Sequence, residues 1–269
     1  MSVRIVDTTL RDGEQAPGVA FRPREKVIIA RLLDRVGVAQ IEAGTPAMGE
    51  LEQEAIKAIV RENLKARVAA WNRIVLEDLR ASVACGVREV HISAPASSIL
   101  VRDKLRQSFR WVLDRLRQAC RFAREQGLRL TVGAEDASRA DPNFLVELAG
   151  LAQELGAERL RYCDTVGVLE PFAVVERLSW LKERVGLELE FHAHNDFGLA
   201  LANTLAAVRA GVAWVDTTAT GLGERAGNTS LEKFYWILKE VCYFDPGLDR
   251  KYLRLLTRYV ARAACRPWA

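Results

Sequence analysis

The chain has 269 residues, a formal net charge of +4 at pH 7, 49% hydrophobic residues and 28% charged residues. This composition excludes a disordered or collagen-like chain, and no apolar run approaches the roughly 18 residues that span a membrane. Residues 1–14 lack the apolar region of a signal peptide, so we expect a cytoplasmic protein. The five cysteines include no Cys-x-x-Cys pair, which indicates reduced thiols rather than a disulfide framework.

Short runs rich in β-branched residues alternate along the chain with longer amphipathic runs. The short runs predict strands over 3–8, 40–44, 66–72, 89–94, 128–135, 159–165, 189–195 and 212–218. The longer runs predict helices over 24–36, 48–64, 76–85, 103–125, 142–155, 171–185, 199–210 and 231–241. Eight strand–helix units of about 30 residues indicate an α/β protein, a (β/α)8 TIM barrel over 1–243, rather than a doubly wound open sheet.

A tail over 244–269 follows the predicted barrel. Its apolar residues recur at helical spacing over 248–265, with basic residues around them. We expect a short helical tail that lies under the barrel or at a subunit contact, and therefore a homo-oligomer.

Two of the three histidines lie at the end of the seventh predicted strand. His192 and His194 are two residues apart, so their side chains point to the same face of that strand. Catalytic groups of a TIM barrel gather at the carboxyl ends of its strands, so this pair predicts a metal site there. The alternative is a pair of hydrogen-bonded core histidines.

The loops after the first and last predicted strands offer oxygen ligands for such a metal. Asp7, Asp12 and Glu14 end or follow the first strand, and any of them would supply a carboxylate. Asn228 lies in a glycine-rich segment after the eighth strand, for which a phosphate-binding loop is the rival interpretation. Two imidazoles, one carboxylate and one amide oxygen suit a divalent cation such as Mn²⁺, Mg²⁺, Zn²⁺ or Fe²⁺.

Five segments resemble signatures of the DRE-TIM metallolyases, and together they cover essentially the whole predicted barrel. They are 7–15 (DTTLRDGEQ), 135–139 (EDASR), 164–167 (DTVG), 192–200 (HAHNDFGLA) and 221–228 (GLGERAGN). Within this family the chain most resembles homocitrate synthases of the nitrogen-fixation type, followed by isopropylmalate and citramalate synthases.

The resemblance implies a divalent Mn, Mg or Zn ion and a set of ligands for it. Asp12, His192 and His194 would bind the metal, with Asn228 as a further or water-mediated ligand. Arg11 beside them would stabilise the developing alkoxide.

The resemblance also implies an acyltransferase reaction. Gln15 would support Arg11, Thr165 would receive the carboxylate of a 2-oxo acid, and Glu135 would belong to the proton-transfer apparatus. The implied reaction is an aldol-type condensation of acetyl-CoA with 2-oxoglutarate, followed by thioester hydrolysis that releases homocitrate and CoA.

The distal carboxylate of 2-oxoglutarate requires a further recognition group. Arg161 shares the strand parity of Thr165 and would either point into the pocket or form a salt bridge in the barrel wall. Arg73 after the third strand is a second candidate, and Glu42 at the end of the second strand is expected to line the same pocket. Lysine-pathway homocitrate synthases carry a histidine after the third strand, which 71–75 lacks.

The synthases of this family continue past the barrel into subdomains that carry a catalytic histidine, and no segment here matches them. Three alternatives remain: a second subunit that supplies this region, a truncated or degenerate chain, and a free-standing lyase or aldolase. The lyases carry a cysteine in the last loop, which 218–228 lacks. A nucleic-acid binder using the basic segment 102–124, a metal-free scaffold and a non-haem iron oxygenase explain the motifs less well, so we expect no nucleic-acid and no membrane partner.

Overall fold

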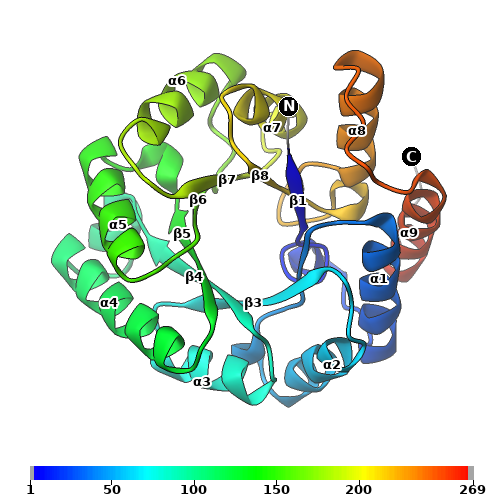
Figure 1. Ribbon diagram of the computed structural model, residues 1–269, viewed down its shortest axis with the longest axis horizontal. Helices are drawn as coiled ribbons and strands as arrows, with labels where there is room; N and C mark the ends of the chain where they lie inside the picture. The colour runs from blue at the N-terminus through cyan, green and yellow to red at the C-terminus, as the bar shows by residue number, and fades with distance from the viewer. Residues whose placement is uncertain (1–2, 266–269) are drawn as a thin grey trace.

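The computed structural model describes residues 3–265, which form a closed barrel of eight parallel strands (Figure 1). Each strand pairs with the next in chain order, and β1 closes the barrel against β8. Helices surround the barrel, which confirms the predicted (β/α)8 fold. The strands are β1 (Arg4–Asp7), β2 (Gln40–Glu42), β3 (Arg67–Arg73), β4 (Glu89–Pro95), β5 (Arg129–Glu135), β6 (Arg159–Asp164), β7 (Glu188–Ala193) and β8 (Trp214–Thr217).

The helices lie close to the predicted ranges. They are α1 (Pro23–Val36), α2 (Glu50–Arg61), α3 (Leu76–Ala84), α4 (Phe109–Glu125), α5 (Pro142–Glu154), α6 (Pro171–Lys182), α7 (Ala200–Arg209), α8 (Leu231–Trp236) and α9 (Arg250–Ala263). Two differ from the sequence prediction. A π-helical turn, Ile237–Val241, follows α8, and α4 begins at Phe109 rather than at 103. Arg106 has a left-handed φ of 55°, and the Ser108 hydroxyl then caps α4 by accepting a hydrogen bond from the Trp111 amide at 3.1 Å.

Charged and polar side chains fill much of the barrel interior, where TIM barrels usually hold branched aliphatic residues. Arg159 and Arg161 of β6 are both almost fully buried. Arg159 donates to Gln40 of β2, and its guanidinium lies 3.8 Å from the ring centre of Trp214 in β8. Neither strand neighbours β6, so these contacts cross the interior of the barrel. Much of the aliphatic core lies instead between the strands and the surrounding helices.

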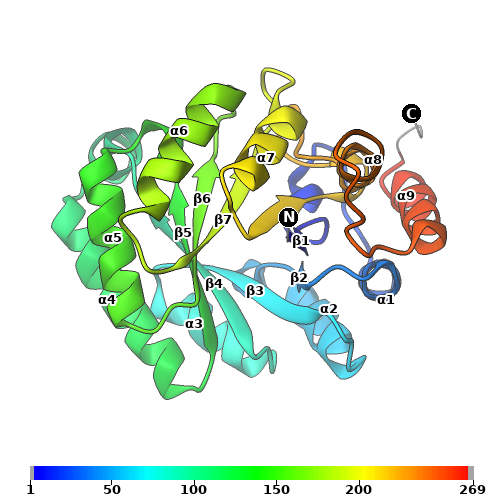
Figure 2. The same cartoon turned by 45° about the horizontal axis from the view of Figure 1, so that its top comes forward.

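Helix α9 packs on the outside of the barrel against α1, and also contacts α8 (Figures 1 and 2). Asp249 caps it by accepting hydrogen bonds from the Lys251 and Tyr252 amides. Leu253, Leu256 and Val260 form its buried face. The tail over 248–265 is therefore helical and packed against the chain's own barrel.

Truncating a buried leucine of α9 tests whether this helix is part of the cooperative fold. Because Leu256 is fully buried, Leu256→Ala is expected to lower the free energy of unfolding by about 2–5 kcal/mol, measured by urea denaturation. Leu255→Ala is the matched control, since its side chain is 42% exposed and should cost less than about 1 kcal/mol. An equally small effect of the two variants would show that α9 unfolds separately from the barrel.

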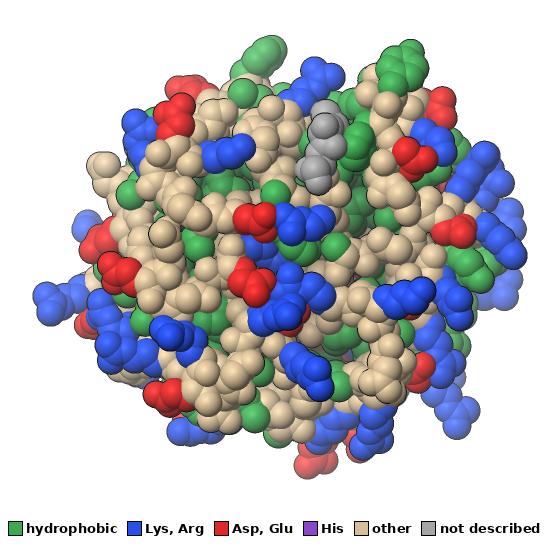
Figure 3. Space-filling model, in the orientation of Figure 1, with side chains coloured by type: hydrophobic (Ala, Val, Ile, Leu, Met, Phe, Trp, Pro, Cys, Tyr) green, Lys and Arg blue, Asp and Glu red, His purple; other side chains and the backbone are tan. Residues whose placement is uncertain are grey.

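The exterior carries charges of both signs. On the face shown in Figure 3, Lys and Arg side chains are interspersed with Asp and Glu, and apolar side chains are scattered among them. Within residues 3–265, no helix is long and apolar enough to cross a membrane.

Candidate metal centre and active site

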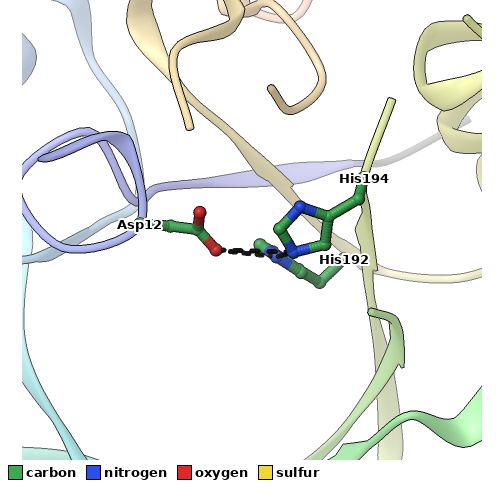
Figure 4. Close-up of side chains that lie close together, drawn as sticks. All are labelled: Asp12, His192 and His194. Atoms are coloured by element: carbon green, nitrogen blue, oxygen red, sulfur yellow. Dashed lines mark hydrogen bonds and ion pairs between the residues drawn. The ribbon is translucent and has the colours of Figure 1, made fainter. Parts of the chain in front are cut away.

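Asp12, His192 and His194 converge at the carboxyl ends of the strands (Figure 4). Asp12 lies in the loop after β1, His192 belongs to β7, and His194 directly follows that strand. The Asp12 Oδ2 atom lies 3.1 Å from His192 Nε2 and 3.7 Å from His194 Nε2, and the two Nε2 atoms are 3.2 Å apart. All three side chains are buried. The structure therefore brings together the two histidines and one of the three candidate carboxylates.

This cluster fits a divalent cation. One carboxylate oxygen and two imidazole nitrogens lie within 4.8 Å of one another, and these ligand types suit Mn²⁺, Mg²⁺ or Zn²⁺. The Asn228 amide donates to Asp12 Oδ1 at 3.0 Å, which places it beside the cluster. Its Oδ1 atom is buried and has no hydrogen-bond partner among the described residues. A buried oxygen in this state is available to a cation or to a water bound to one.

Asp216 of β8 orients the first of the two histidines. Its Oδ2 atom lies 2.8 Å from His192 Nδ1, so the carboxylate holds the ring with Nε2 facing Asp12. Carboxylate partners of this kind fix the ring orientation and tautomer of metal-binding histidines. Asp216 was not among the predicted site residues, although an acidic residue inside the apolar segment 212–218 was a usable signal.

The members of this cluster have different charge states. Burial lowers the pKa of His192, but Asp12 and Asp216 outweigh that effect and raise it to about 9. Burial, together with the charge on His192, lowers the pKa of His194 to about 3. Burial opposes ionisation of Asp12, yet Arg11 and His192 hold its pKa well below the usual range. One imidazolium therefore balances the Asp12 carboxylate, and its proton must leave when a cation binds.

Arg11 is held in a fixed orientation beside this cluster. Its Nε donates to Glu42 Oε2 at 2.5 Å, and its Nη1 lies 3.1 Å from Asp12 Oδ2. The guanidinium carbon is also 5.7 Å from the ring centre of Trp71. Gln15, three residues after Asp12, is exposed at the end of the 3₁₀ turn Gly13–Gln15.

The ends of β5 and β6 contribute two more of the predicted residues. Burial raises the pKa of Glu135, against the opposing effect of Lys104 and Arg11. The Thr165 hydroxyl accepts a hydrogen bond from the Asp136 amide at 2.8 Å, which does not use its own proton. Burial therefore favours the protonated form of Glu135 more than in an exposed carboxyl group, and the Thr165 hydroxyl keeps its own proton available for a hydrogen bond.

The remaining predicted residues are ion-paired. Arg73 pairs with Asp78 at 2.8 Å through a side chain that is 60% exposed. Arg161 is buried among carboxylates, 3.0 Å from Glu42 Oε1 and 3.1 Å from Asp216 Oδ2. For Arg161, this is the salt-bridge alternative that the sequence left open, since its guanidinium is ion-paired with carboxylates inside the barrel.

The other two carboxylates near the first strand have different partners. Glu14 pairs with Lys26 of α1 at 2.5 Å. Asp7 is buried, accepts from the Thr9 amide at 2.9 Å, and its Oδ2 atom has no hydrogen-bond partner among the described residues. Neither belongs to the metal cluster, which leaves Asp12 as its carboxylate.

The buried Asp7 makes stability fall with rising pH. Burial raises its pKa from 3.8 to about 7, so the folded state binds this proton more tightly than the unfolded state between those values. The contribution is complete below about pH 4 and is lost as the pH rises to about 7. Asp7→Asn cannot ionise at this position, so its free energy of unfolding should not show this decrease. The difference in free energy of unfolding between Asp7→Asn and the parent should therefore shift in favour of the variant by roughly 2 kcal/mol between pH 5 and pH 8. Urea denaturation at both pH values measures it, and a pH-independent difference would contradict it.

The fold and site define a class of protein: a (β/α)8 barrel with a buried carboxylate and two imidazoles, fit for a divalent cation, at the carboxyl ends of its strands. The profile of the HMGL-like family matches residues 2–260, and the chain belongs to this family. This confirms the resemblance stated from the motifs.

Relatives of this chain are named as synthases. A 2-isopropylmalate synthase 2 of Caldanaerobacter subterraneus subsp. tengcongensis is 49% identical over 265 residues, covering 98% of this chain and 69% of that protein. Homocitrate synthase 1 of Nostoc sp. is 50% identical over 262 residues, covering 97% and 70%. Homocitrate synthase subunit alpha of Clostridium pasteurianum is 44% identical over 241 residues, covering 90% of each. The chain is therefore an enzyme of the acyl-transferring class.

A solved structure has the same fold. The HMG-CoA lyase of Bacillus subtilis superposes with a TM-score of 0.88 at 23% identity, covering 99% of this chain and 95% of the other. At this identity the likeness supports the barrel fold alone.

Proposed function

We propose that this chain condenses acetyl-CoA with 2-oxoglutarate to give homocitrate and CoA. The observation that carries the proposal is the meeting of Arg11 with the cluster Asp12, His192 and His194 at the carboxyl ends of the strands. The similarity to proteins named homocitrate synthase supports this choice of reaction.

Asp12, His192 and His194 would hold the divalent cation, with Asn228 as a further or water-mediated ligand. When bound, the cation supplies Lewis-acid polarisation of a carbonyl group. Arg11 supplies a second positive charge at the same place, because its guanidinium contacts Asp12 directly. It would donate hydrogen bonds to the keto oxygen as negative charge develops on it, and Gln15 would support that contact.

Residues at the ends of neighbouring strands would transfer the proton and bind the substrate. The Thr165 hydroxyl would donate to the carboxylate next to the keto group, and Glu135 would take part in removing a proton from the methyl group of acetyl-CoA. The resulting carbanion attacks the keto carbon, a carbon–carbon bond forms, and the alkoxide takes up a proton. Water then cleaves the thioester and releases CoA.

Glu42 and Arg73 would both act on the substrate side of the site. Glu42 would line the pocket floor and act on substrate through Arg11, which it binds at 2.5 Å. Arg73 at the end of β3 is the cation that we propose for the distal carboxylate of 2-oxoglutarate. The relative named subunit alpha supports a further proposal, that a second polypeptide completes the site.

A second candidate is condensation with a different 2-oxo acid. A relative named 2-isopropylmalate synthase is about as similar as the homocitrate synthases, so 2-oxoisovalerate and pyruvate are competing acceptors. The barrel shared with an HMG-CoA lyase bears on the fold alone.

The test is CoA release from acetyl-CoA in the presence of Mn²⁺ or Mg²⁺, with each of the three acceptors in turn. Release selective for 2-oxoglutarate, and lost in Asp12→Ala, is the expected result. Preference for pyruvate or 2-oxoisovalerate would favour the second candidate. No release with any acceptor, from protein shown by titration to bind Mn²⁺, would contradict both for this chain alone.

A further inference from the structure

Six side chains form a closed ring of ion pairs inside the barrel, toward the carboxyl ends of its strands. In order they are Asp12, Arg11, Glu42, Arg161, Asp216 and His192. The successive closest distances are 3.1, 2.5, 3.0, 3.1, 2.8 and 3.1 Å. Acidic and basic groups alternate around the ring, so each charge lies between two of the opposite sign.

Arg161 occupies the side of this ring opposite to Asp12. It lies between Glu42 and Asp216, and its Nε also donates to Glu190 of β7 at 2.5 Å. These carboxylates are fully buried, so without a cation they would repel one another in a medium of low polarity.

Each of the two ring carboxylates beside Arg161 also contacts the next basic member of the ring, and Glu42 Oε1 additionally lies 3.0 Å from His91 Nδ1. Glu42 uses its other oxygen to hold the Nε of Arg11. Asp216 holds Nδ1 of His192 through the same oxygen that lies 3.1 Å from Arg161. A displacement of Arg161 would therefore reach both Arg11 and a ligand of the metal cluster.

We propose that Arg161 is a positioning residue that holds Glu42 and Asp216 in place, so that Arg11 and His192 face the same point. It contacts neither metal nor substrate in this role. The inference rests on the proposed metal centre, and turnover enters only as a second readout.

Arg159 provides a matched control on the same strand. It is as deeply buried as Arg161, lies two residues earlier, and pairs with Glu190 at 3.2 Å. Its other contacts are the Thr131 hydroxyl, Gln40 and the Trp214 ring, all of them one layer further from the metal cluster. A merely structural role for buried arginines would make the two positions equivalent.

The experiment compares Arg161→Gln, Arg161→Lys and Arg159→Gln with the parent. The Mn²⁺ dissociation constant is measured by electron paramagnetic resonance of free Mn²⁺, and folding by urea denaturation. Arg161→Gln is expected to weaken Mn²⁺ binding by about tenfold, the low end of the effect of losing an outer partner of a metal ligand, because Arg161 reaches His192 only through Asp216. Arg161→Lys should weaken it by about 3- to 10-fold, because an ammonium cannot span both carboxylates as the guanidinium fork does. Arg159→Gln should change it by less than about threefold, whatever its cost in stability.

Turnover provides a separate readout. We expect kcat to fall by at least about tenfold in Arg161→Gln at saturating Mn²⁺, with a smaller change in KM, because Arg11 loses its orientation. If the parent releases no CoA, the proposed function fails. If Arg161→Gln still binds Mn²⁺ more weakly than that parent, the positioning role of Arg161 is supported all the same.

Three results would overturn the inference: parent-like Mn²⁺ affinity in folded Arg161→Gln, equal weakening in Arg159→Gln, or a parent that binds no Mn²⁺. If Arg161→Gln does not fold, Arg161→Lys decides, and unchanged Mn²⁺ affinity in that variant would also overturn it.

Discussion

Replacing Asp12 with alanine is expected to abolish Mn²⁺ binding and to lower kcat for CoA release by at least about 10³-fold, since the cation supplies several kcal/mol of transition-state stabilisation. Asp12 is the only carboxylate of the cluster found among the described residues, and Arg11 and His192 keep it ionised. Without it two neutral imidazoles are a poor site for a divalent cation. Titration with Mn²⁺ and circular dichroism of the same protein measure binding and folding.

Glu14→Gln is the control for this prediction. Glu14 lies two residues further along the same loop, but its carboxylate points to Lys26 rather than to the histidines. We expect this variant to bind Mn²⁺ within about threefold of the parent. Intact Mn²⁺ binding in folded Asp12→Ala would remove Asp12 from the ligand set.

Replacing Arg11 with lysine is expected to lower kcat by about 10²- to 10³-fold, the effect of removing one donor to a developing oxyanion. The guanidinium bonds to Glu42 through Nε and to Asp12 through Nη1, and a lysine ammonium cannot reproduce that planar fork. Steady-state kinetics at saturating Mn²⁺ measure the loss.

Two comparisons make the Arg11 result specific. The Mn²⁺ dissociation constant should stay within about tenfold of the parent, because the metal ligands remain. Arg225→Lys, in the loop after β8 and paired with Asp196 at 2.7 Å, should keep kcat within about tenfold. A kcat for Arg11→Lys within threefold of the parent would contradict the role given to Arg11.

The barrel was predictable because its signals are local. Each strand is a short apolar run and each helix a longer periodic one, so eight repeats define the fold before any contact is known. The pair His192 and His194 was predictable for the same reason, since alternation along one strand places both rings on one side.

The choice of carboxylate depended on contacts between distant segments. From residue type alone, Asp7, Asp12 and Glu14 were equivalent, and the resemblance to a family singled out Asp12. The structure gives a physical reason for this choice. Glu14 forms an ion pair with Lys26 of α1, and Asp7 is buried in β1 and accepts a hydrogen bond from the Thr9 amide, so neither carboxylate faces the histidines.

The role of Arg161 was beyond a sequence argument. Strand parity placed its side chain inside the barrel, but not the carboxylates that meet it there. Those come from β2, β7 and β8, far apart in the chain, and only closure of the barrel brings them together.

The charged interior also constrains how the chain can assemble. An amino-terminal half that ends after β4 would contain Glu42 and His91 but not the arginines of β6. The complementary half would hold Arg161 with Asp216 but without Glu42. Each half would keep one arginine of the ring, but the pairs Glu42–Arg161 and Asp12–His192 would be broken. The first half would then bury an unbalanced negative charge and the second an unbalanced positive charge, which is costly in a dry interior. We therefore expect each half to be less stable alone than in the closed barrel, so that the two halves unfold together rather than one after the other.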